Sequence, residues 1–334
     1  MGYGEKKRKI EKKGMLIKRI LLGVLLVCLL GLCIFSHFYP PESWKYYVSK
    51  PNVSRRKSGE LRMHFLDVGQ GDCTLIEFPD GQVALIDGGE DSGYARRSLL
   101  RTLNALKIKT IDHLIVTHTD EDHCGALEEL LKYKKVVNAY LPAASPLSGS
   151  VYAGFYADVV KKAECYVSSR NVELSVADGD YPYVFTFLLP YEYDVEEGEN
   201  AEEDNDGSAA LWLDYRGVSA LLSGDVPAKT LERLTDDDSL GYLREYGVTL
   251  SSTEILKASH HGAADSTSDV ILEYMHTETA VISCGAENRY GHPSSAALDL
   301  LAEYGVEVYR TDEQENILIT VRENGEYLLS TYGK

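Results

Sequence analysis

The sequence predicts an α/β fold, an αββα sandwich in which helices cover two sheets, preceded by one N-terminal transmembrane helix. Three observations support this prediction. A basic segment followed by an uncharged apolar run occupies the N-terminus. Residues 61–334 contain short apolar strands, first in close succession and later alternating with helical segments. The chain is also 44% hydrophobic, which is enough apolar surface for a sizeable core.

The N-terminal segment predicts a membrane anchor. Eight Lys and Arg residues lie between Lys6 and Arg19, and an uncharged run from Ile20 to Phe35 follows. This run is slightly short of the roughly 20 residues that a spanning helix needs, and flanking apolar and aromatic residues can extend it. The positive-inside rule predicts residues 1–19 in the cytoplasm, residues 20–36 in the membrane and the remainder outside the cell.

A cleaved signal peptide is the alternative interpretation of this segment. No small-x-small site follows the apolar core, and Leu32 before Cys33 makes a poor lipoprotein cleavage site. We therefore expect an uncleaved single-pass anchor in the cell membrane. Residues 37–60, which contain Pro51 and the basic patch Arg55–Lys57, are expected to form a tether to a hydrolase domain at 61–334.

Charge is unevenly distributed along the chain. Residues 1–60 carry 13 Lys and Arg against 4 Asp and Glu, a net of +9, whereas the whole chain carries −18. Residues 61–334 therefore carry −27. Such an acidic body repels polyanions over most of its surface, so a nucleic-acid substrate would need a local basic strip, such as Arg96, Arg97 and Arg101 or the tether. The cysteines are scattered without a C-x-x-C pair, which indicates neither a zinc ribbon nor a disulfide framework.

The body begins with a predicted β-meander. Its strands are LRMHFLD, CTLIEF and QVALID, separated by the turn signals GQGD and PDG. Helices are predicted near 94–107, 124–133 and 152–163. The acidic stretch from Glu192 to Asp206 lacks apolar periodicity and is predicted to be a solvated loop. Later strands are predicted at VFTFLL, SAALWLDY, VSALLSGD, EILKAS, TAVISC and VEVYR, alternating with helices and followed by a closing hairpin.

The strongest chemical signal lies between the apolar strand HLIVT and the following helix. Four potential metal ligands occur within six residues there: His118, Asp120, Asp122 and His123. Imidazoles and carboxylates of this kind can converge on divalent cations. Crowded together without a cation, these groups would repel each other or remain unpaired, so the spacing favours a metal site over a structural loop.

Six segments together resemble a known family. They are FLDVGQGDCTLI, LIDGG, VTHTDEDHCGAL, LLSGDV, LKASHHG and NRYGHPS, and they span about Phe65 to Ser294. The HTDEDH segment is similar to the H-x-[HD]-x-D-H motif of the metallo-β-lactamase superfamily. In content and order the six segments resemble the hydrolase-like domain of ComEC/Rec2 competence proteins.

The resemblance implies two divalent metal ions and a role for each matched residue. One ion would be bound by His118 and Asp120, and the other by Asp122 and His123. Asp225 would bridge the two ions, and either His260 or His261 would complete the second set. Candidate metal ligands are thus His118, Asp120, Asp122, His123, Asp225, His260 and His261.

Further residues receive supporting roles. Asp87 of LIDGG, by the same resemblance, would orient the ligand loop without binding metal. Asp67, Gln70 and Asp72 form a polar turn beside it and are candidates for the same role, with an ordinary turn as the alternative. His292 of YGHP is expected near the site, where it could donate a proton to the substrate; a structural loop histidine is the alternative. Candidate catalytic residues are Asp122, His260 and His292.

The sequence departs from the common superfamily pattern in two places. Asp120 stands where many members have histidine, although the competence-like branch commonly has Asp. No histidine lies between His123 and Asp225, and the corresponding stretch offers Asn205, Asp206 or Ser208 instead. The first metal site should therefore be rich in oxygen ligands and weaker for zinc, which leaves Zn²⁺, Mn²⁺ and a state with a single bound ion open.

The resemblance implies a metal-dependent hydrolase in which a metal-bound hydroxide attacks a phosphoester, with DNA phosphodiesters as the expected substrate. The strong negative charge favours a different enzyme, an extracellular phosphoesterase acting on cell-wall phosphocholine or a similar cationic or neutral group. A β-lactamase is less expected because the third histidine is missing. A non-catalytic binding module that keeps the fold is the remaining alternative.

Overall fold

The computed structural model describes residues 2–38, 41–143, 147, 149–170, 172–191 and 205–333. The chain divides into two compact units, Met1–Val48 and Ser49–Lys334. The predicted solvated loop from Glu192 to Asp206 lies outside the described residues except at its end, where Asn205–Gly207 form a short 3-10 helix, η2.

The first unit consists of helix α1 (Gly2–Phe38) and the short 3-10 helix η1 (Pro41–Tyr46). Within α1, the 27 residues from Lys12 to Phe38 are long and apolar enough to cross a membrane. The helix is much longer than the predicted anchor at 20–36 because Lys, Arg and Glu are good helix formers, so the basic segment continues the same helix.

Part of the predicted tether belongs to the second unit. Arg62 donates from Nη1 to the carbonyl oxygen of Ser54 at 2.6 Å, and Arg56 donates from Nη1 to that of Pro79 at 3.2 Å. These contacts attach residues 54–56 to the first strand of the body and to the turn after its second strand. That residues 37–60 act as a tether remains a prediction.

The second unit is built around two sheets. The larger has the order β14-β13-β1-β2-β3-β4-β5-β6 and the smaller the order β12-β11-β10-β9-β8-β7. Strands of the larger sheet are β1 (Leu61–Phe65), β2 (Thr74–Glu77), β3 (Val83–Ile86), β4 (Thr110–Ile115), β5 (Lys135–Leu141), β6 (Glu164–Val167), β13 (Asn316–Val321) and β14 (Tyr327–Tyr332). Strands of the smaller are β7 (Val184–Leu189), β8 (Ala210–Tyr215), β9 (Val218–Leu222), β10 (Ile255–Lys257), β11 (Thr279–Ile282) and β12 (Glu307–Arg310).

Apolar side chains from both sheets form the central core. Phe65 of β1 and Ile76 of β2 are fully buried in one cluster with Phe187 of β7 and Leu211 of β8. Full burial of side chains of this size contributes about 1.5–3 kcal/mol each, so this layer between the sheets stabilises the domain strongly. It forms because the inward positions of each strand are apolar.

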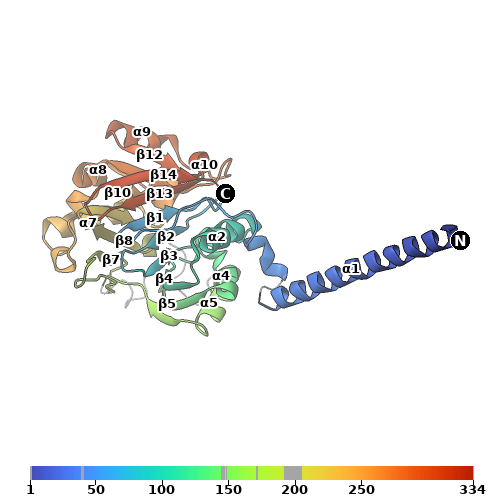
Figure 1. The fold of residues 1–334 in the computed structure, drawn as a ribbon. Helices are drawn as coiled ribbons and strands as arrows, with labels where there is room; N and C mark the ends of the chain where they lie inside the picture. The colour runs from blue at the N-terminus through green and yellow to red at the C-terminus, as the bar shows by residue number, and fades with distance from the viewer. Residues whose placement is uncertain are drawn as a thin grey trace. The chain divides into compact units, whose positions relative to one another are not determined.

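Helices cover the outer faces of the sheets (Figure 1). On the smaller sheet, Leu256 of β10 packs in one cluster with Leu234, Ile271 and Leu301 of three helices. The described helices of this unit are α2 (Gly93–Leu106), α3 (Glu121–Cys124), α4 (Leu127–Tyr133), α5 (Ser150–Val159), α7 (Ala228–Ser239), α8 (Asp269–Met275), α9 (Ser295–Glu303) and α10 (Thr311–Gln314). The predicted αββα sandwich is confirmed.

Two local predictions need correction. The helix predicted at 124–133 is two helices, α3 and α4, separated at Gly125. A Cβ at Gly125 would lie 2.1 Å from the backbone nitrogen of Asp91, so the chain turns where another segment approaches closely. Strand β6 was not predicted. All four of its residues are exposed, so it lacks the apolar pattern by which strands are recognised.

Strand direction determines where the site forms. Strands β3 to β6 run parallel, and so do β9 to β12. The chain therefore leaves β3, β4, β9, β10 and β11 at the carboxyl edges of two packed sheets. Ligand sites of α/β proteins commonly form at such edges. Five of the six matched segments lie at or after the ends of these strands, whereas FLDVGQGDCTLI follows β1.

Candidate metal centre

The loop that follows β4 brings His118 and His123 together. Their rings lie with centroids 4.1 Å apart, and the short helix α3 begins directly after Asp120. Asp87, at the end of β3, supports this loop through hydrogen bonds. It accepts hydrogen bonds from the backbone nitrogen of Thr117 at 2.9 Å and from the Thr117 hydroxyl at 2.7 Å. The second oxygen of Asp87 also lies 2.8 Å from Nδ1 of His123, which leaves Nε2 of His123 facing the cluster.

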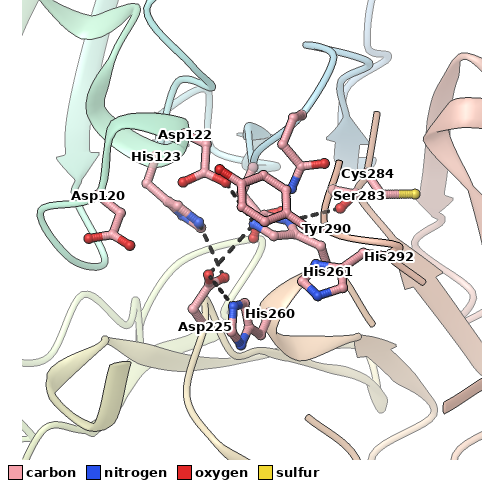
Figure 2. Close-up of polar contacts among 12 residues, drawn as sticks. Asp120, Asp122, His123, Asp225, His260, His261, Ser283, Cys284, Tyr290 and His292 are labelled. Atoms are coloured by element: carbon pink, nitrogen blue, oxygen red, sulfur yellow. Dashed lines mark hydrogen bonds and ion pairs between the residues drawn. The ribbon is translucent and has the colours of Figure 1, made fainter. Parts of the chain in front are cut away.

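Asp225 lies at the centre of the cluster (Figure 2). Its Oδ1 is 3.2 Å from Nε2 of His123. Its Oδ2 is 3.6 Å from Nε2 of His261, 3.8 Å from Nε2 of His118 and 3.9 Å from Nε2 of His260. One buried carboxylate therefore faces four imidazoles that come from two different sheet edges.

His260 and His261 occupy different environments although they are neighbours. Both adopt left-handed backbone conformations, with φ of 46° and 55°. His261 is buried, its Nδ1 lies 2.9 Å from the carbonyl oxygen of Ser283, and its Nε2 lies 3.2 Å from Oδ2 of Asp122. His260 is 30% exposed in its side chain. The tight turn thus directs one ring into the cluster and the other toward its rim.

A buried ion pair lies behind His261. The Nζ of Lys257 is 2.7 Å from Oδ2 of Asp72, and both side chains are almost fully buried. The other oxygen of Asp72 lies 3.3 Å from Nδ1 of His261. Asp72 was predicted as a candidate supporting residue in a polar turn, and Lys257 was missed. A charged residue in the otherwise apolar strand EILKAS was the available signal, since such a residue must have a partner.

Gly71 allows the Asp72 loop to approach the ligand loop. Its φ is +112°, and a Cβ there would lie 1.9 Å from the carbonyl oxygen of Asp122. The backbone nitrogen of Asp72 donates to this same carbonyl at 3.1 Å. Only glycine satisfies both the backbone angle and the close approach, so the position of Asp122 depends on it.

Opposite charges determine the protonation of the cluster. Burial raises the pKa of Asp225, but His123 and His261 outweigh burial and hold it well below its usual value. Burial lowers the pKa of His123, but Asp225 and Asp87 hold it well above its usual value. For His261, Asp225 and Asp72 likewise outweigh burial and raise the pKa to about 10. Protons on these imidazoles thus balance the negative charge of the carboxylates, and a bound cation could replace those protons.

The chemistry of the donor set fits a metal ion. Among the described residues, six buried nitrogen and oxygen atoms of histidine and aspartate side chains in and beside the cluster lack a hydrogen-bond partner: Nε2 of His118, His123 and His261, Nδ1 of His292, and Oδ1 of Asp72 and Asp225. Ligand atoms of Asp72, His123, Asp225 and His261 lie within 4.8 Å of one another. Buried polar atoms without partners are costly, and nitrogen and oxygen donors at this spacing are those that divalent metals use.

The remaining predicted residues lie around this cluster. The Asp120 side chain is 64% exposed, with Oδ2 3.7 Å from Nε2 of His118. Ser208, one of three residues considered in place of the third histidine, is buried with its hydroxyl 3.4 Å from Nδ1 of His118. The side chain of Asp206 instead accepts a hydrogen bond from Thr230.

His292 and Asp67 lie in different surroundings. The His292 ring centroid lies 5.3 Å from that of His260. Asp67 accepts hydrogen bonds from the Tyr94 hydroxyl at 2.7 Å and from the backbone nitrogen of Gly69 at 3.1 Å. Asp67 therefore shapes a neighbouring cavity, whereas His292 lies beside the imidazoles.

Comparison with known proteins identifies the family. Residues 66–286 match the model of the metallo-beta-lactamase superfamily, and this segment contains all seven candidate metal ligands. The chain therefore belongs to the metallo-beta-lactamase superfamily, and the family predicted from the sequence is confirmed.

Curated relatives are competence and recombination proteins. Recombination protein 2 of Haemophilus influenzae is 27% identical over 251 residues, covering 74% of this chain and 27% of that protein. The chain is 30% identical over 279 residues to ComE operon protein 3 of Bacillus subtilis, covering 78% of this chain and 33% of that protein. It is 28% identical over 295 residues to Competence protein ComA of Neisseria gonorrhoeae, covering 87% of this chain and 37% of that protein. The chain thus spans about a third of the length of these relatives, and the predicted resemblance to competence proteins is confirmed.

Solved structures with similar folds are more distant. CmlA, a diiron beta-hydroxylase from Streptomyces venezuelae, is 15% identical with a TM-score of 0.48, over 80% of this chain and 55% of that one. The metallo-beta-lactamase fold protein YhfI from Bacillus subtilis is 11% identical with a TM-score of 0.43, over 75% of this chain and 96% of that one.

Proposed function

We propose that this chain is a membrane-anchored, metal-dependent phosphodiesterase. One observation carries the proposal: imidazole nitrogens that lack hydrogen-bond partners, from two sheet edges, converge on the buried carboxylate of Asp225. Membership in a superfamily that is generally composed of metal-dependent hydrolases supports hydrolysis as the reaction type. The names of the curated relatives, which are competence and recombination proteins, support a nucleic-acid phosphodiester as the substrate.

The ligand assignment follows the distances. We assign His118 and Asp120 to one ion, and Asp122, His123 and His261 to the other, with Asp225 shared between them. His261 is preferred to His260 because its Nε2 is buried beside both Asp122 and Asp225, whereas His260 lies at the rim. Bound Zn²⁺ or Mn²⁺ would supply Lewis acidity and lower the pKa of a coordinated water.

Residues around the ligands fix which nitrogen of each ring faces the centre. Asp87 accepts the Nδ1 proton of His123, and the carbonyl oxygen of Ser283 accepts that of His261. Each ring therefore presents Nε2 in a defined tautomer, which increases the basicity of the ligand. In this proposal Asp87 orients His123 without binding the metal itself.

His292 is positioned to donate a proton to the leaving group. Its Nδ1 has no hydrogen-bond partner among the described residues, although it is buried. Burial, together with the neighbouring rings of His260 and His261, holds the pKa of His292 below its usual value. After taking up a proton, an imidazole of this kind can donate that proton to the oxygen of the leaving group. His260, at the rim of the centre, can do the same.

We further propose that the protein is a single-pass protein of the cell membrane with its N-terminus in the cytoplasm and its catalytic domain outside. The basic residues precede the apolar part of α1, and such residues are retained on the cytoplasmic side. Labelling of single cysteines on intact cells tests this orientation. Protection of a cysteine placed in the body would contradict it.

The phosphocholine alternative also has a structural observation in its favour. A cavity of about 590 Å³ is lined by Gln70 and Asn288, which border the site, and by five carboxylates. These are Asp67, Glu90, Asp312, Glu313 and Glu315. A carboxylate-lined cavity favours a cationic group over a polyanion. We therefore retain a phosphoester with a cationic group as the second candidate substrate.

Three substrates separate the candidate functions. The full-length chain in detergent micelles, stripped of metal and reloaded with Mn²⁺ or Zn²⁺, is assayed on bis-p-nitrophenyl phosphate, single-stranded DNA and p-nitrophenylphosphocholine. We expect metal-dependent cleavage of the diester and of DNA. Preference for the choline ester would support the second candidate instead.

Two variants serve as controls for this assay. Asp122→Ala should abolish turnover, whereas Asp299→Ala, an exposed aspartate on α9, should leave it unchanged. No turnover of any substrate by protein that binds metal would refute the hydrolase proposal. That outcome would support the non-catalytic binding module.

A further inference from the structure

The rings of Tyr290, His292, His260 and His261 lie near one another at the candidate metal centre (Figure 2). Tyr290 is 52% exposed, and its ring stacks on His292 with centroids 5.9 Å apart and planes at 24°. The His292 ring in turn lies 5.3 Å from that of His260 and 6.2 Å from that of His261. Tyr290 is therefore the outermost ring of a set whose inner members surround the centre.

The loop beneath Tyr290 is held in place by one side chain. The Oδ1 of Asn288 accepts hydrogen bonds from the backbone nitrogens of Tyr290 at 3.1 Å and His292 at 3.0 Å. The Nδ2 of Asn288 donates to the carbonyl oxygen of Gly285 at 2.9 Å. Because the loop is organised internally, its aromatic ring can accept a ligand at a small cost in conformational entropy.

A positive charge accompanies this ring. Arg289 donates from Nη2 to the Tyr290 hydroxyl at 2.7 Å, and its guanidinium lies 4.9 Å from the centre of the ring. Arg289 also lies within electrostatic range of Glu121 and Asp122, which places it at the rim of the same centre. Residues 61–334 carry a net charge of −27, and the exposed guanidinium of Arg289 places positive charge at this point of an acidic body.

An exposed aromatic ring beside an arginine matches the chemistry of a nucleotide. Proteins that bind single strands stack bases on aromatic side chains and pair phosphates with basic ones. A phosphodiester held at the metal centre carries a base next to the scissile phosphate and another phosphate beyond it. Both groups would lie within the region occupied by Tyr290 and Arg289.

We propose that Tyr290 stacks on a nucleobase that flanks the scissile phosphate and that Arg289 contacts the following phosphate. The substrate is then a single-stranded nucleic acid, because a base within a duplex already has both faces stacked. This inference rests on the proposed function and specifies its substrate class. Tyr290 is in this account a specificity-determining residue that acts on binding.

The test compares binding of two oligonucleotides. End-labelled oligothymidylate and an oligonucleotide of the same length that lacks its bases are titrated with the full-length chain in detergent, and binding is followed by fluorescence anisotropy. We expect the wild-type protein to bind the base-bearing strand about 5- to 150-fold more tightly, as one stacked base allows. Tyr290→Leu should lose this preference, and Tyr290→Phe, which keeps the ring, should retain most of it.

Controls separate this inference from the proposed function. Tyr242→Leu, at another exposed tyrosine, should keep the wild-type preference. Equal affinity of the wild-type protein for the two strands would overturn the inference, and so would a preference that survives in Tyr290→Leu. Hydrolysis of bis-p-nitrophenyl phosphate is measured on the same samples. Its absence in the wild-type protein refutes the phosphodiesterase proposal, whereas the base preference alone decides the role of Tyr290.

Discussion

Replacing Lys257 by Met tests the buried ion pair behind His261. The substitution removes an ammonium that lies 2.7 Å from Oδ2 of Asp72, with both side chains almost fully buried. Asp72 would then remain as a buried charge without its main partner. Removing one partner of such a pair costs about 3–5 kcal/mol, a large part of the 5–15 kcal/mol by which folded proteins are stable.

The size of the effect can be measured by thermal unfolding of the metal-loaded full-length protein. For domains of this size about 1 kcal/mol corresponds to 2–4 °C, so we expect Tm to fall by roughly 6 °C or more. The affinity for Mn²⁺ or Zn²⁺ should fall about 10- to 100-fold, because Asp72 no longer supports the orientation of His261. Isothermal titration of the metal-stripped protein measures this second effect.

A double variant distinguishes the two effects of Lys257. Asp72→Asn combined with Lys257→Met removes the unpaired charge, so it should recover much of the lost stability without recovering metal affinity. Burial raises the pKa of Asp72, but Lys257 and His261 hold it below its usual value. The pair therefore stabilises the fold at pH values above about 4, and its contribution is lost as the pH falls through the folded pKa. A Lys257→Met protein with unchanged Tm and unchanged metal affinity would refute this reasoning.

Three other substitutions probe the site and the fold. Asp87→Asn removes an acceptor for His123, while asparagine tolerates the same left-handed backbone. We expect metal binding to weaken about 10- to 100-fold, as measured by calorimetry. Unchanged metal affinity would contradict the orienting role of Asp87. Gly71→Ala should displace Asp122 and abolish phosphodiester hydrolysis while circular dichroism stays native, and full activity would refute the close approach. Burial holds the pKa of His64 below 6.5 in the folded protein. The contribution of neutral His64 to the free energy of unfolding is therefore fully present above pH 6.5, and it is lost as the pH falls through the folded pKa. In urea unfolding, His64→Gln should therefore reduce the loss of stability on acidification by up to about 1.4 kcal/mol per pH unit; identical pH profiles would contradict this.

Much of the fold could be predicted because its strands are short apolar runs bounded by glycine and aspartate turns. The meander β1-β2-β3 and the strand before His118 follow directly from this pattern. The exposed strand β6 lacks the pattern and was missed. The break at Gly125 was missed because it depends on the approach of Asp91, which is distant in sequence.

The site was predictable in composition but not in detail. Motif spacing indicated the residues that gather at the sheet edges, since each follows an apolar strand. The distinction between His260 and His261 depends on two consecutive left-handed residues, which the sequence does not reveal. The pair of Lys257 and Asp72 depends on how the two sheets pack, because each residue belongs to a different sheet edge.

The most direct test of the central claim is the metal content of the full-length protein. After stripping, reloading with Mn²⁺ or Zn²⁺ and removing excess metal, mass spectrometry counts the ions bound per chain in the wild-type protein and in Asp225→Asn. We expect two ions in the wild-type protein and loss of at least one in the variant, because Asp225 faces every imidazole of the cluster. A wild-type protein that retains no ion, or a variant with unchanged content, would contradict the assignment of this cluster as a metal centre.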